Sequence, residues 1–413
     1  MTARLLDGPA LAAGPETLAA HTIRLGPLPG PGDRQALPPM LDAAGLLGRG
    51  GAGFPVGRKW ASVAGRSEGR AIVLANGAEG EPLSAKDRVL MSTRPHLVLD
   101  GAELAAAAVG AEHIVIYVGS EHRAARAAIG RALEERMADM RRIATRVPTE
   151  LVAAPPIYVA GEESAAVHFI NEGDARPTAT PPRPFESGID GRPTLVQNVE
   201  SLAHAALIAR RGDQWYREAG RSETHGTALI TIGGAPTPGV AEIEIGTTLA
   251  EVAETAGAPV SLGPVLLGGY FGGWVAGRSA WQAPLDPQVL RRSGAAFGCG
   301  VVRFLRTDEC GVRATALILD FMAGQSAAQC GPCVFGLRAI ADAAARLARG
   351  TARGDDLRRV SGWSQTLAGR GACRHPDGAV GLLRSALRTF DDDFTAHQRG
   401  RGCVAGQRAW AAA

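Results

Sequence analysis

The sequence predicts an α/β domain, followed by a small β-rich domain and a C-terminal helical bundle. Three observations support this order. Short apolar runs alternate with helical patterns up to about residue 221, which is typical of an α/β layer. Short strands and glycines follow, and segments rich in Ala, Arg and Leu return at helical spacing from Ala314 onward. A chain of 413 residues has room for two or three domains, each with its own core.

The first 40 residues are rich in Pro and Gly, so we expect an irregular N-terminal lead-in. The α/β domain then covers residues 41–221. Its elements follow from apolar runs and from helical spacing. In order, they are a strand at 71–75, a helix at 96–109, a strand at 113–118, a helix at 121–140 and a strand at 157–160.

We expect the β-rich domain at residues 222–305 and the helical domain at 306–413. The β-rich domain is predicted to hold strands at 227–232 and 239–245, a helix at 249–256 and short strands within 264–274. The helical domain is predicted to hold helices at 314–322, 337–348, 355–367 and 380–397. Four such helices are enough for a small bundle.

Charge and hydropathy exclude several classes of protein. A net charge of +3 spread along the chain gives no basis for a nucleic-acid surface or a polybasic membrane arm. The most apolar stretch, 101–120, is interrupted by Glu103, Glu112 and His113, and the N-terminus has no apolar segment after a basic start. We therefore expect a soluble cytoplasmic protein with no direct membrane insertion.

Only two of the 44 basic residues are lysines, Lys59 and Lys86, and both lie in motifs. Lys59 ends the glycine-rich segment 48–60, whose backbone N–H groups can approach a phosphate closely. Lys86 follows the polar loop 76–82, directly after the first strand. An ordinary glycine-rich loop explains the first segment equally well when it is taken alone. The retention of lysine in both motifs nevertheless makes the two residues functional candidates.

Two further motifs are expected near the same edge of the sheet. The strand predicted at 157–160 ends in Gly161-Glu162-Glu163, and a proline-rich segment, 176–184, leads to the polar stretch 191–200. Open α/β sheets bind their ligands at the carboxyl ends of the strands. We therefore expect these loops to form one crevice.

The cysteines indicate a second site. Cys330 and Cys333 form a Cys-x-x-Cys pair ahead of a helix, and Cys373 and His375 follow farther along the chain. An iron–sulfur cluster, a zinc ion held by these three cysteines and His375, and unligated thiols are all compatible with this spacing. A thioredoxin-like dithiol would need a βαβ context, which a helical segment does not offer. The remaining cysteines are expected to be ordinary thiols: Cys299, Cys310 and Cys403.

Taken in order, these motifs resemble the flavoprotein subunit that binds NADH and FMN in respiratory complex I, and its relatives in NAD-linked hydrogenases and formate dehydrogenases. The resemblance runs from about residue 47 to residue 397. The segments that carry it are 48–60, 76–82 with Lys86-Asp87-Arg88, 158–163, 191–201 and 329–336. Five matches in the same order make the resemblance specific to this family.

The resemblance implies a Rossmann-like FMN domain, a ubiquitin-like β-grasp domain and a four-helix bundle with a [4Fe-4S] cluster. It implies that these residues line FMN: Gly48, Gly50, Lys59, Asn76, Glu79, Tyr158, Gly161, Glu162, Val196, Gln197 and Asn198. It places Phe54, Glu81 and Glu163 at NADH, and Cys330, Cys333 and Cys373 at the cluster. The flavin itself would carry out the hydride chemistry, with Glu79 and Glu81 nearby.

The chain departs from the family pattern at several of these positions. Ser62 and Arg183 replace aromatic residues and Thr180 replaces a lysine in the region that holds the adenine half of NADH, so aromatic stacking is reduced. Arg183 could instead stack on a purine or attract a phosphate. Within the FMN motifs, Ala78, Gly80 and Gln197 replace Asp, Ser and Asn.

At the cluster motif, Ala327 stands where the family has its first cysteine. The site could hold a [3Fe-4S] cluster, recruit Cys310 or Cys299, use His375, bind zinc, or have lost its metal. The spacing alone does not choose among these.

The resulting hypothesis is an electron-transfer flavoprotein subunit and an NADH dehydrogenase-type oxidoreductase. Hydride would pass from NADH, or another reduced donor, to FMN, and single electrons would then pass through an iron–sulfur cluster to a ferredoxin-like or membrane partner. One alternative is a non-catalytic scaffold or electron relay of the same fold, with a degenerate NADH site and an altered cluster or zinc site. Another is a zinc-stabilised binding protein. The family works in multisubunit assemblies, so partner subunits are expected.

Overall fold

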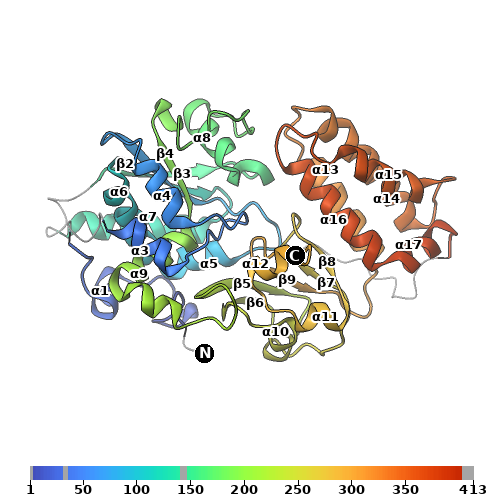
Figure 1. The fold of residues 1–413 in the computed structure, drawn as a ribbon, viewed down its shortest axis with the longest axis horizontal. Helices are drawn as coiled ribbons and strands as arrows, with labels where there is room; N and C mark the ends of the chain where they lie inside the picture. Colours follow the sequence, from blue (N-terminus) through green and yellow to red (C-terminus); the bar gives the residue numbers. More distant parts are fainter. Residues whose placement is uncertain (1–2, 31–35, 140–146, 402–413) are drawn as a thin grey trace. The chain divides into compact units, whose positions relative to one another are not determined.

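The computed structural model describes residues 3–30, 36–139 and 147–401 (Figure 1). The chain divides into two compact units. Unit 1 comprises Met1–Gly80, Ser84–Ile230 and Val240–Gly246, and unit 2 comprises Glu81–Leu83, Thr231–Gly239 and Thr247–Ala413.

Unit 1 is built on a four-stranded parallel sheet with the strand order β3-β2-β1-β4. Its strands are β1 (Ala71–Gly77), β2 (Ala111–Gly119), β3 (Thr149–Ala154) and β4 (Thr194–Asn198). The two central strands are buried along most of their length, as in a parallel sheet that is covered on both faces. This confirms the predicted α/β fold with a parallel sheet.

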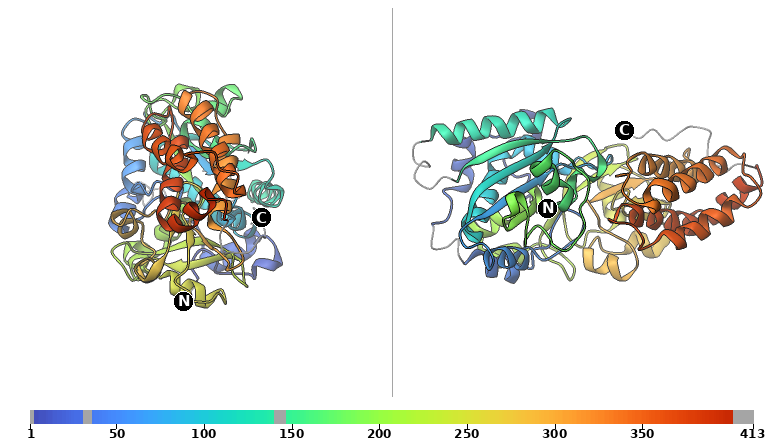
Figure 2. Two further views of the ribbon diagram at one scale, coloured as in Figure 1. Left: turned by 90° about the vertical axis from the view of Figure 1, so that its right-hand side faces the viewer. Right: turned by 90° about the horizontal axis from the view of Figure 1, so that it is seen from above.

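Alternate residues of each strand face opposite sides of the sheet. Val73, Ala75 and Leu195 face a large core formed with α3 (Leu37–Ala44), α4 (Val56–Ala64), α6 (Pro95–Val109), α7 (Arg123–Ala138) and α9 (Val199–Arg217). Leu74 and Val196 face a smaller core that includes residues of α8 (Glu163–Glu172). Helices therefore lie on both sides of the sheet, as Figure 2 shows.

Most elements of unit 1 agree with the predicted ones to within a few residues, but the strand predicted at 157–160 is wrong. Tyr158–Gly161 forms a 3₁₀ turn, η3. The third strand is β3, which ends at Ala154, six residues before the predicted end at residue 160. Pro155 and Pro156 separate the two. Because proline has no backbone N–H to donate to a neighbouring strand, β3 ends before them.

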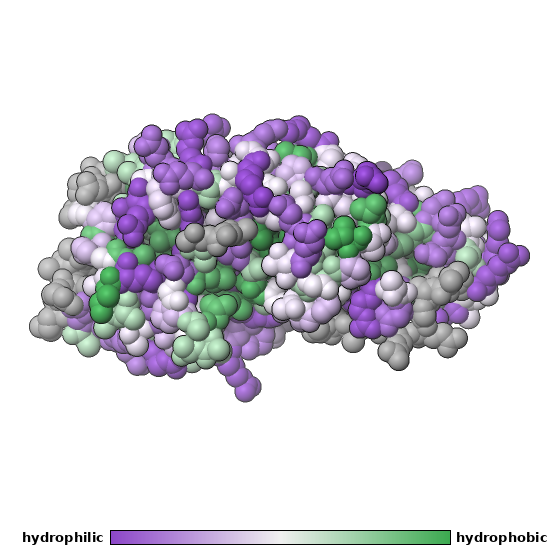
Figure 3. Space-filling model, turned by 90° about the horizontal axis from the view of Figure 1, so that it is seen from below, coloured by the Kyte–Doolittle hydropathy of each residue, from purple (hydrophilic) through white to green (hydrophobic). Residues whose placement is uncertain are grey.

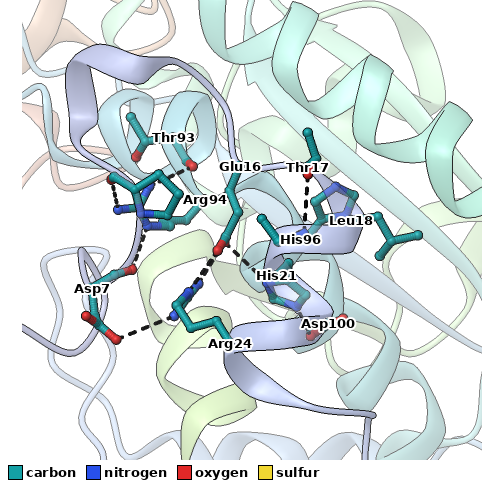
Figure 4. A network of polar contacts seen from close by, with 12 residues as sticks. Asp7, Glu16, Thr17, Leu18, His21, Arg24, Thr93, Arg94, His96 and Asp100 are labelled. Atoms are coloured by element: carbon teal, nitrogen blue, oxygen red, sulfur yellow. Dashed lines mark hydrogen bonds and ion pairs between the residues drawn. The ribbon is translucent and has the colours of Figure 1, made fainter.

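The N-terminal lead-in is more regular than predicted. It contains a short 3₁₀ turn, Leu11–Ala13, and α1 (Leu18–Leu25), which begins at Thr17 as its N-cap. The buried His21 lies between two carboxylates, with Nε2 2.7 Å from Asp100 and Nδ1 3.4 Å from Glu16. Arg24 pairs with Glu16 at 2.7 Å (Figure 4). These buried charges attach the segment to α6, a long-range contact that composition does not reveal.

The second sheet has the strand order β6-β5-β9-β7-β8. Its strands are β5 (Thr227–Gly233), β6 (Gly239–Glu244), β7 (Val265–Leu267), β8 (Gly273–Val275) and β9 (Val301–Phe304). β5 and β9 are parallel, whereas β7 is antiparallel to both β8 and β9. Three short helices accompany the strands: α10 (Leu249–Thr255), α11 (Gly277–Gln282) and α12 (Pro287–Arg292).

The C-terminal part of unit 2 is helical. It contains α13 (Gly311–Gly324), the single π-turn η5 (Pro332–Gly336), α14 (Leu337–Arg349), α15 (Asp356–Leu367), α16 (His375–Thr389) and α17 (Asp391–Gln398). α13 packs against α14 and α16, and α15 packs against α14 and α16 (Figure 1). The single helix predicted at 380–397 is wrong, because Phe390 interrupts it with a non-helical backbone between α16 and α17.

Within the described residues, every helix is too short or too polar to cross a membrane. On the face drawn in Figure 3, hydrophobic residues occur among hydrophilic ones rather than as one continuous apolar surface.

The Glu16→Gln variant should lower the free energy of unfolding of unit 1 by about 2 kcal/mol at neutral pH, because a hydrogen bond to a charged group contributes about 1.5–3 kcal/mol. Burial opposes the ionisation of Glu16, but hydrogen bonds from Arg24 and His21 outweigh it and lower the pKa of Glu16 from 4.5 to about 2. This stabilisation is present above about pH 4.5 and is lost as the pH falls toward 2.

Urea unfolding followed by circular dichroism should therefore show a difference between variant and parent that shrinks as the pH is lowered. Glu68→Gln is the matched control, because the side chain of Glu68 is 81% exposed and should contribute little. Equal effects of the two substitutions would contradict the stabilising role of the buried network.

Candidate functional site

The residues predicted to form a crevice meet where β1 and β4 end. Asn76, near the end of β1, is paired in register with Asn198, the last residue of β4. The amide of Asn76 also donates a hydrogen bond from Nδ2 to the carbonyl of Gly161, at 2.8 Å. Two strand ends and the η3 turn therefore meet at one place, the edge at which open α/β sheets bind ligands.

The glycine-rich loop borders this place. The N–H of Gly48 donates to the carbonyl of Phe54 at 2.9 Å and closes the loop. Gly51 and Gly53 have φ values of +106° and +65°, which favour glycine. A Cβ added to Gly50 would lie 3.4 Å from Cβ of Asn198. The loop thus brings its backbone beside the end of β4, and glycine leaves room for a ligand to approach it.

The polar loop 76–82, called the acidic loop for Glu79 and Glu81, packs closely on η3. A Cβ added to Gly80 would lie only 2.7 Å from the carbonyl oxygen of Tyr158. One added to Gly161 would lie 3.6 Å from Cβ of Ala78. The small residues at 78 and 80, which the sequence suggested only as lost FMN contacts, therefore permit close contact between two loops of the crevice.

Lys86, a functional candidate from the sequence, is buried. Its side chain is 2% exposed, and Nζ is 2.7 Å from Asp87 Oδ1 and 2.8 Å from Glu200 Oε2. Burial disfavours the ammonium, but the two carboxylates outweigh burial and raise the pKa of Lys86. Asp87 in turn accepts a hydrogen bond from Nδ2 of Asn198 at 2.7 Å. Lys86 therefore supports Asn198 through Asp87.

Glu79 caps the N-terminus of α5 (Lys86–Thr93). Its carboxylate accepts hydrogen bonds from Ser84 Oγ at 2.7 Å and from the N–H groups of Asp87 and Arg88, both at 2.9 Å. Burial and the nearby Asp87 raise the pKa of Glu79 to about 7, although Lys86 and these hydrogen bonds oppose the shift. The predicted FMN residue thus also fixes the acidic loop to α5.

Charged side chains meet at the start of α8. Lys59 Nζ lies 3.0 Å from one carboxylate oxygen of Glu163, and Arg183 lies 4.0 Å from the other. Glu162 is the N-cap of α8, because Oε2 accepts the N–H groups of Ser164 and Ala165. Two cations therefore surround one partly exposed carboxylate beside a helix N-terminus, which favours an anionic ligand.

Gln197 and Val196 point to opposite faces of the sheet. Gln197 is buried and accepts a hydrogen bond at Oε1 from the indole of Trp60, at 3.3 Å. Val196 belongs to the core on the opposite face. The carboxamide of Gln197 therefore holds α4 against β4.

The remaining predicted dinucleotide residues lie in different units. Phe54, in unit 1, is 54% exposed. Glu81 belongs to unit 2, where Oε2 accepts the N–H of Tyr270 at 2.8 Å. A Cβ added to Gly269 would lie 2.8 Å from the same Glu81 oxygen. The glycine-rich loop 268–273 thus wraps closely around Glu81.

The predicted cluster cysteines lie at one end of the C-terminal helices. Cys330 precedes η5, Cys333 lies within it, and Cys373 precedes α16, which η5 contacts. Ser326 Oγ donates to Cys333 Sγ at 3.0 Å. Ala327, at the position of the missing cysteine, is buried. Among the described residues, no three His, Cys, Asp or Glu side chains converge on a point suitable for a single metal ion. Ligands of a cluster bind separate iron atoms and need no such convergence.

Three supporting residues were not identified as such from the sequence. Asp87 and Glu200 form the ion pairs with Lys86, and the buried Arg49 donates its N–H to Ser201 Oγ at 2.9 Å. Arg49 also donates from Nη2 to the carbonyl of Thr227 at 2.9 Å. All three are charged residues within the quoted motifs. Their charge was visible in the sequence, but their burial was not.

Two family matches cover most of the regions described above. Residues 41–206 match the Nuo51 FMN-binding domain, and residues 313–397 match the iron-sulfur binding region of NADH-ubiquinone oxidoreductase F.

Named relatives extend the similarity over most of the chain. The F subunit of the NADH-quinone oxidoreductase of Rhodobacter capsulatus is 31% identical over 381 residues, which cover 88% of this chain and 88% of the relative. The corresponding F subunit of Escherichia coli is 31% identical over 371 residues, which cover 86% and 82% of the two chains. The crystal structure of an NAD⁺-reducing [NiFe]-hydrogenase in the H₂-reduced state is similar at a TM-score of 0.81 and 28% identity, covering 94% of this chain and 67% of that one.

The Gly80→Ala variant should weaken FMN binding at least about tenfold, which corresponds to about 1.4 kcal/mol. The new methyl group would meet the Tyr158 carbonyl at 2.7 Å and displace η3 from the end of β1. Fluorescence titration of the apoprotein with FMN measures the effect. Gly130→Ala, in α7, is the matched control, since a Cβ there meets no atom within 4 Å. An unchanged affinity in Gly80→Ala would contradict the assignment of this loop contact to the site.

Proposed function

Because the chain belongs to the family of the F subunit of NADH-quinone oxidoreductase, we propose that it takes electrons from NADH at a bound FMN and passes them through an iron–sulfur cluster to a partner protein. It is an oxidoreductase subunit of the NADH dehydrogenase type. The observation that carries this proposal is the convergence of Asn76, Asn198 and the glycine-rich loop at the carboxyl ends of adjacent parallel strands.

The residues of the crevice suit FMN. The glycine-rich loop offers its backbone where Gly50 lies beside Asn198, and Lys59 supplies positive charge for the flavin phosphate. Asn76 and Asn198 offer polar groups at the strand ends, and both are already fixed by hydrogen bonds. When bound, FMN accepts a hydride and releases electrons singly. The protein orients it and holds the charges that surround it.

NADH binding is proposed to use Phe54 and Glu163, which are exposed or partly exposed residues of unit 1, and Glu81 of unit 2. Glu163 lies between Lys59 and Arg183, so its charge is balanced and an anionic dinucleotide is not repelled. Phe54 offers an exposed ring for stacking. Glu81 is the third predicted dinucleotide residue, and its carboxylate is held by the N–H of Tyr270.

The proposed layout assigns each step to a part of the chain. Residues 41–221 form a Rossmann-like FMN and NADH domain, residues 222–305 a β-grasp domain, and residues 306–413 a helical bundle that holds the cluster. The mixed sheet with β5 parallel to β9 supports the second part, and the mutual packing of α13, α14, α15 and α16 supports the third.

The electron acceptor is proposed to be a separate ferredoxin-like or membrane-associated subunit, reached from the cytoplasm. The relatives of this chain are named as subunits of NADH-quinone oxidoreductase, which implies an assembly of several chains.

A visible absorption spectrum of the anaerobically purified protein, recorded before and after addition of NADH, tests the proposal. A flavin band that bleaches on addition supports both FMN binding and NADH oxidation. A flavin band that NADH leaves unchanged would assign another donor to the site. No flavin band, together with no affinity for added FMN, would overturn the proposal.

The Arg183→Ala variant should raise KM for NADH about fivefold and leave kcat nearly unchanged, because a loss of uniform binding changes KM alone. Arg183 lies 4.0 Å from Glu163 and is 60% exposed in its side chain, so it is available to a phosphate of the dinucleotide. Steady-state kinetics with a dye acceptor measure both constants. Arg176→Ala is the control, since Arg176 lies in the same segment but pairs with Asp174. An equal change in both variants would assign the effect to overall charge.

A further inference from the structure

The chain has three cysteines in the cluster motif, so the identity of a fourth ligand is open. The three cysteines belong to the end of the bundle where α13 finishes. Ser326, two residues beyond α13, donates a hydrogen bond to Cys333, and η5 contacts α16, which begins two residues after Cys373. A fourth ligand has to come from this end.

His375 is held at this end in a defined orientation. It is the first residue of α16 and is buried, and Nε2 lies 2.7 Å from the carbonyl oxygen of Met322, near the end of α13. A carbonyl oxygen can only accept a hydrogen bond, so Nε2 carries the proton and Nδ1 carries the lone pair. Metal-binding histidines have this arrangement, in which the other ring nitrogen donates to a carbonyl or carboxylate.

A second contact fixes the imidazole ring. Phe271, from the loop 268–273, lies with its ring centre 6.0 Å from that of His375. Phe271 also fits against Gly378, one helical turn along α16, where an added Cβ would lie 2.2 Å from the phenyl ring. The position of His375 is therefore set by contacts from both α13 and the loop 268–273.

The other candidate ligands are placed less well. Cys310 precedes α13 at the opposite end of that helix, and 14 residues at about 1.5 Å each separate the two ends by about 21 Å. Its Sγ lies 3.4 Å from Nε2 of the buried His397. Cys299 Sγ donates to the carbonyl of Gly268. Ser326 Oγ lies 3.0 Å from Cys333 Sγ, too close for the two to bind different iron atoms.

We propose that His375 is the fourth ligand of the iron–sulfur cluster, through Nδ1, alongside Cys330, Cys333 and Cys373. The inference rests on the proposed function, which supplies the cluster. Because a neutral imidazole replaces a thiolate, the cluster with its ligands carries one negative charge fewer. The reduction potential of this cluster is therefore higher than that of an all-cysteine cluster, as His ligands raise it elsewhere.

Pulsed EPR of the anaerobically purified, dithionite-reduced full chain tests the assignment. A nitrogen coupling that changes on labelling with ¹⁵N-histidine is expected in the parent protein and absent in His375→Ala. His375→Cys should keep four irons per cluster, lose the nitrogen coupling and show a lower potential. His168→Ala is the matched control, because His168 is bonded to Arg176 and Glu172 within unit 1 and should leave the coupling unchanged.

The outcomes separate this inference from the proposed function. A four-iron cluster without nitrogen coupling in the parent protein would overturn the role of His375 and leave the function in place. So would a [3Fe-4S] cluster that is unchanged in His375→Ala. Zinc without iron or sulfide, or no metal after reconstitution, would overturn both the inference and the cluster step of the function. FMN content on the same samples reports the folding of unit 1, and helical circular dichroism reports the folding of unit 2, which contains His375.

Discussion

The crevice in unit 1 depends on the buried ion pairs of Lys86. One ammonium joins Asp87, at the start of α5, to Glu200, in the first turn of α9. Burying three charges is costly, and removal of one partner from such a group typically destabilises a protein by about 3–5 kcal/mol. Asn198 is fixed through Asp87, and Glu200 also accepts the N–H of Leu229 at 2.9 Å. The orientation of Asn198 is thus supported by a buried charge.

This dependence explains which features could be predicted from the sequence. The apolar runs of β1 and β2 and the helical spacing of α6 and α7 report local periodicity, and they identified these elements correctly. Strand β3 was missed because its residues are only partly buried and their sequence shows little periodicity. The more apolar run at 157–160, after Pro155 and Pro156, was therefore predicted to be the strand. The alternation of α and β segments was sufficient for the fold class.

The sequence predicted that the motifs of the candidate site meet at the strand ends, but it did not predict the contacts of their side chains. The motifs at the strand ends meet as expected, because parallel strands direct their carboxyl ends to one edge. The sequence could not show that Glu79 caps α5, that Gln197 faces Trp60 or that Lys86 is buried. Each of these facts depends on a partner far along the chain or on the face of a strand, and local spacing determines neither.

In unit 2, the loop 268–273 contacts both Glu81, a predicted dinucleotide residue, and His375, the proposed cluster ligand. The N–H of Tyr270 holds Glu81, and the ring of the next residue, Phe271, packs against His375. Gly268 and Gly269 have φ values of +87° and +86°, and a Cβ on Gly272 would lie 1.9 Å from the carbonyl of Leu267, so this loop conformation requires glycine at these positions. This loop thus contacts both a predicted dinucleotide residue and the proposed cluster ligand.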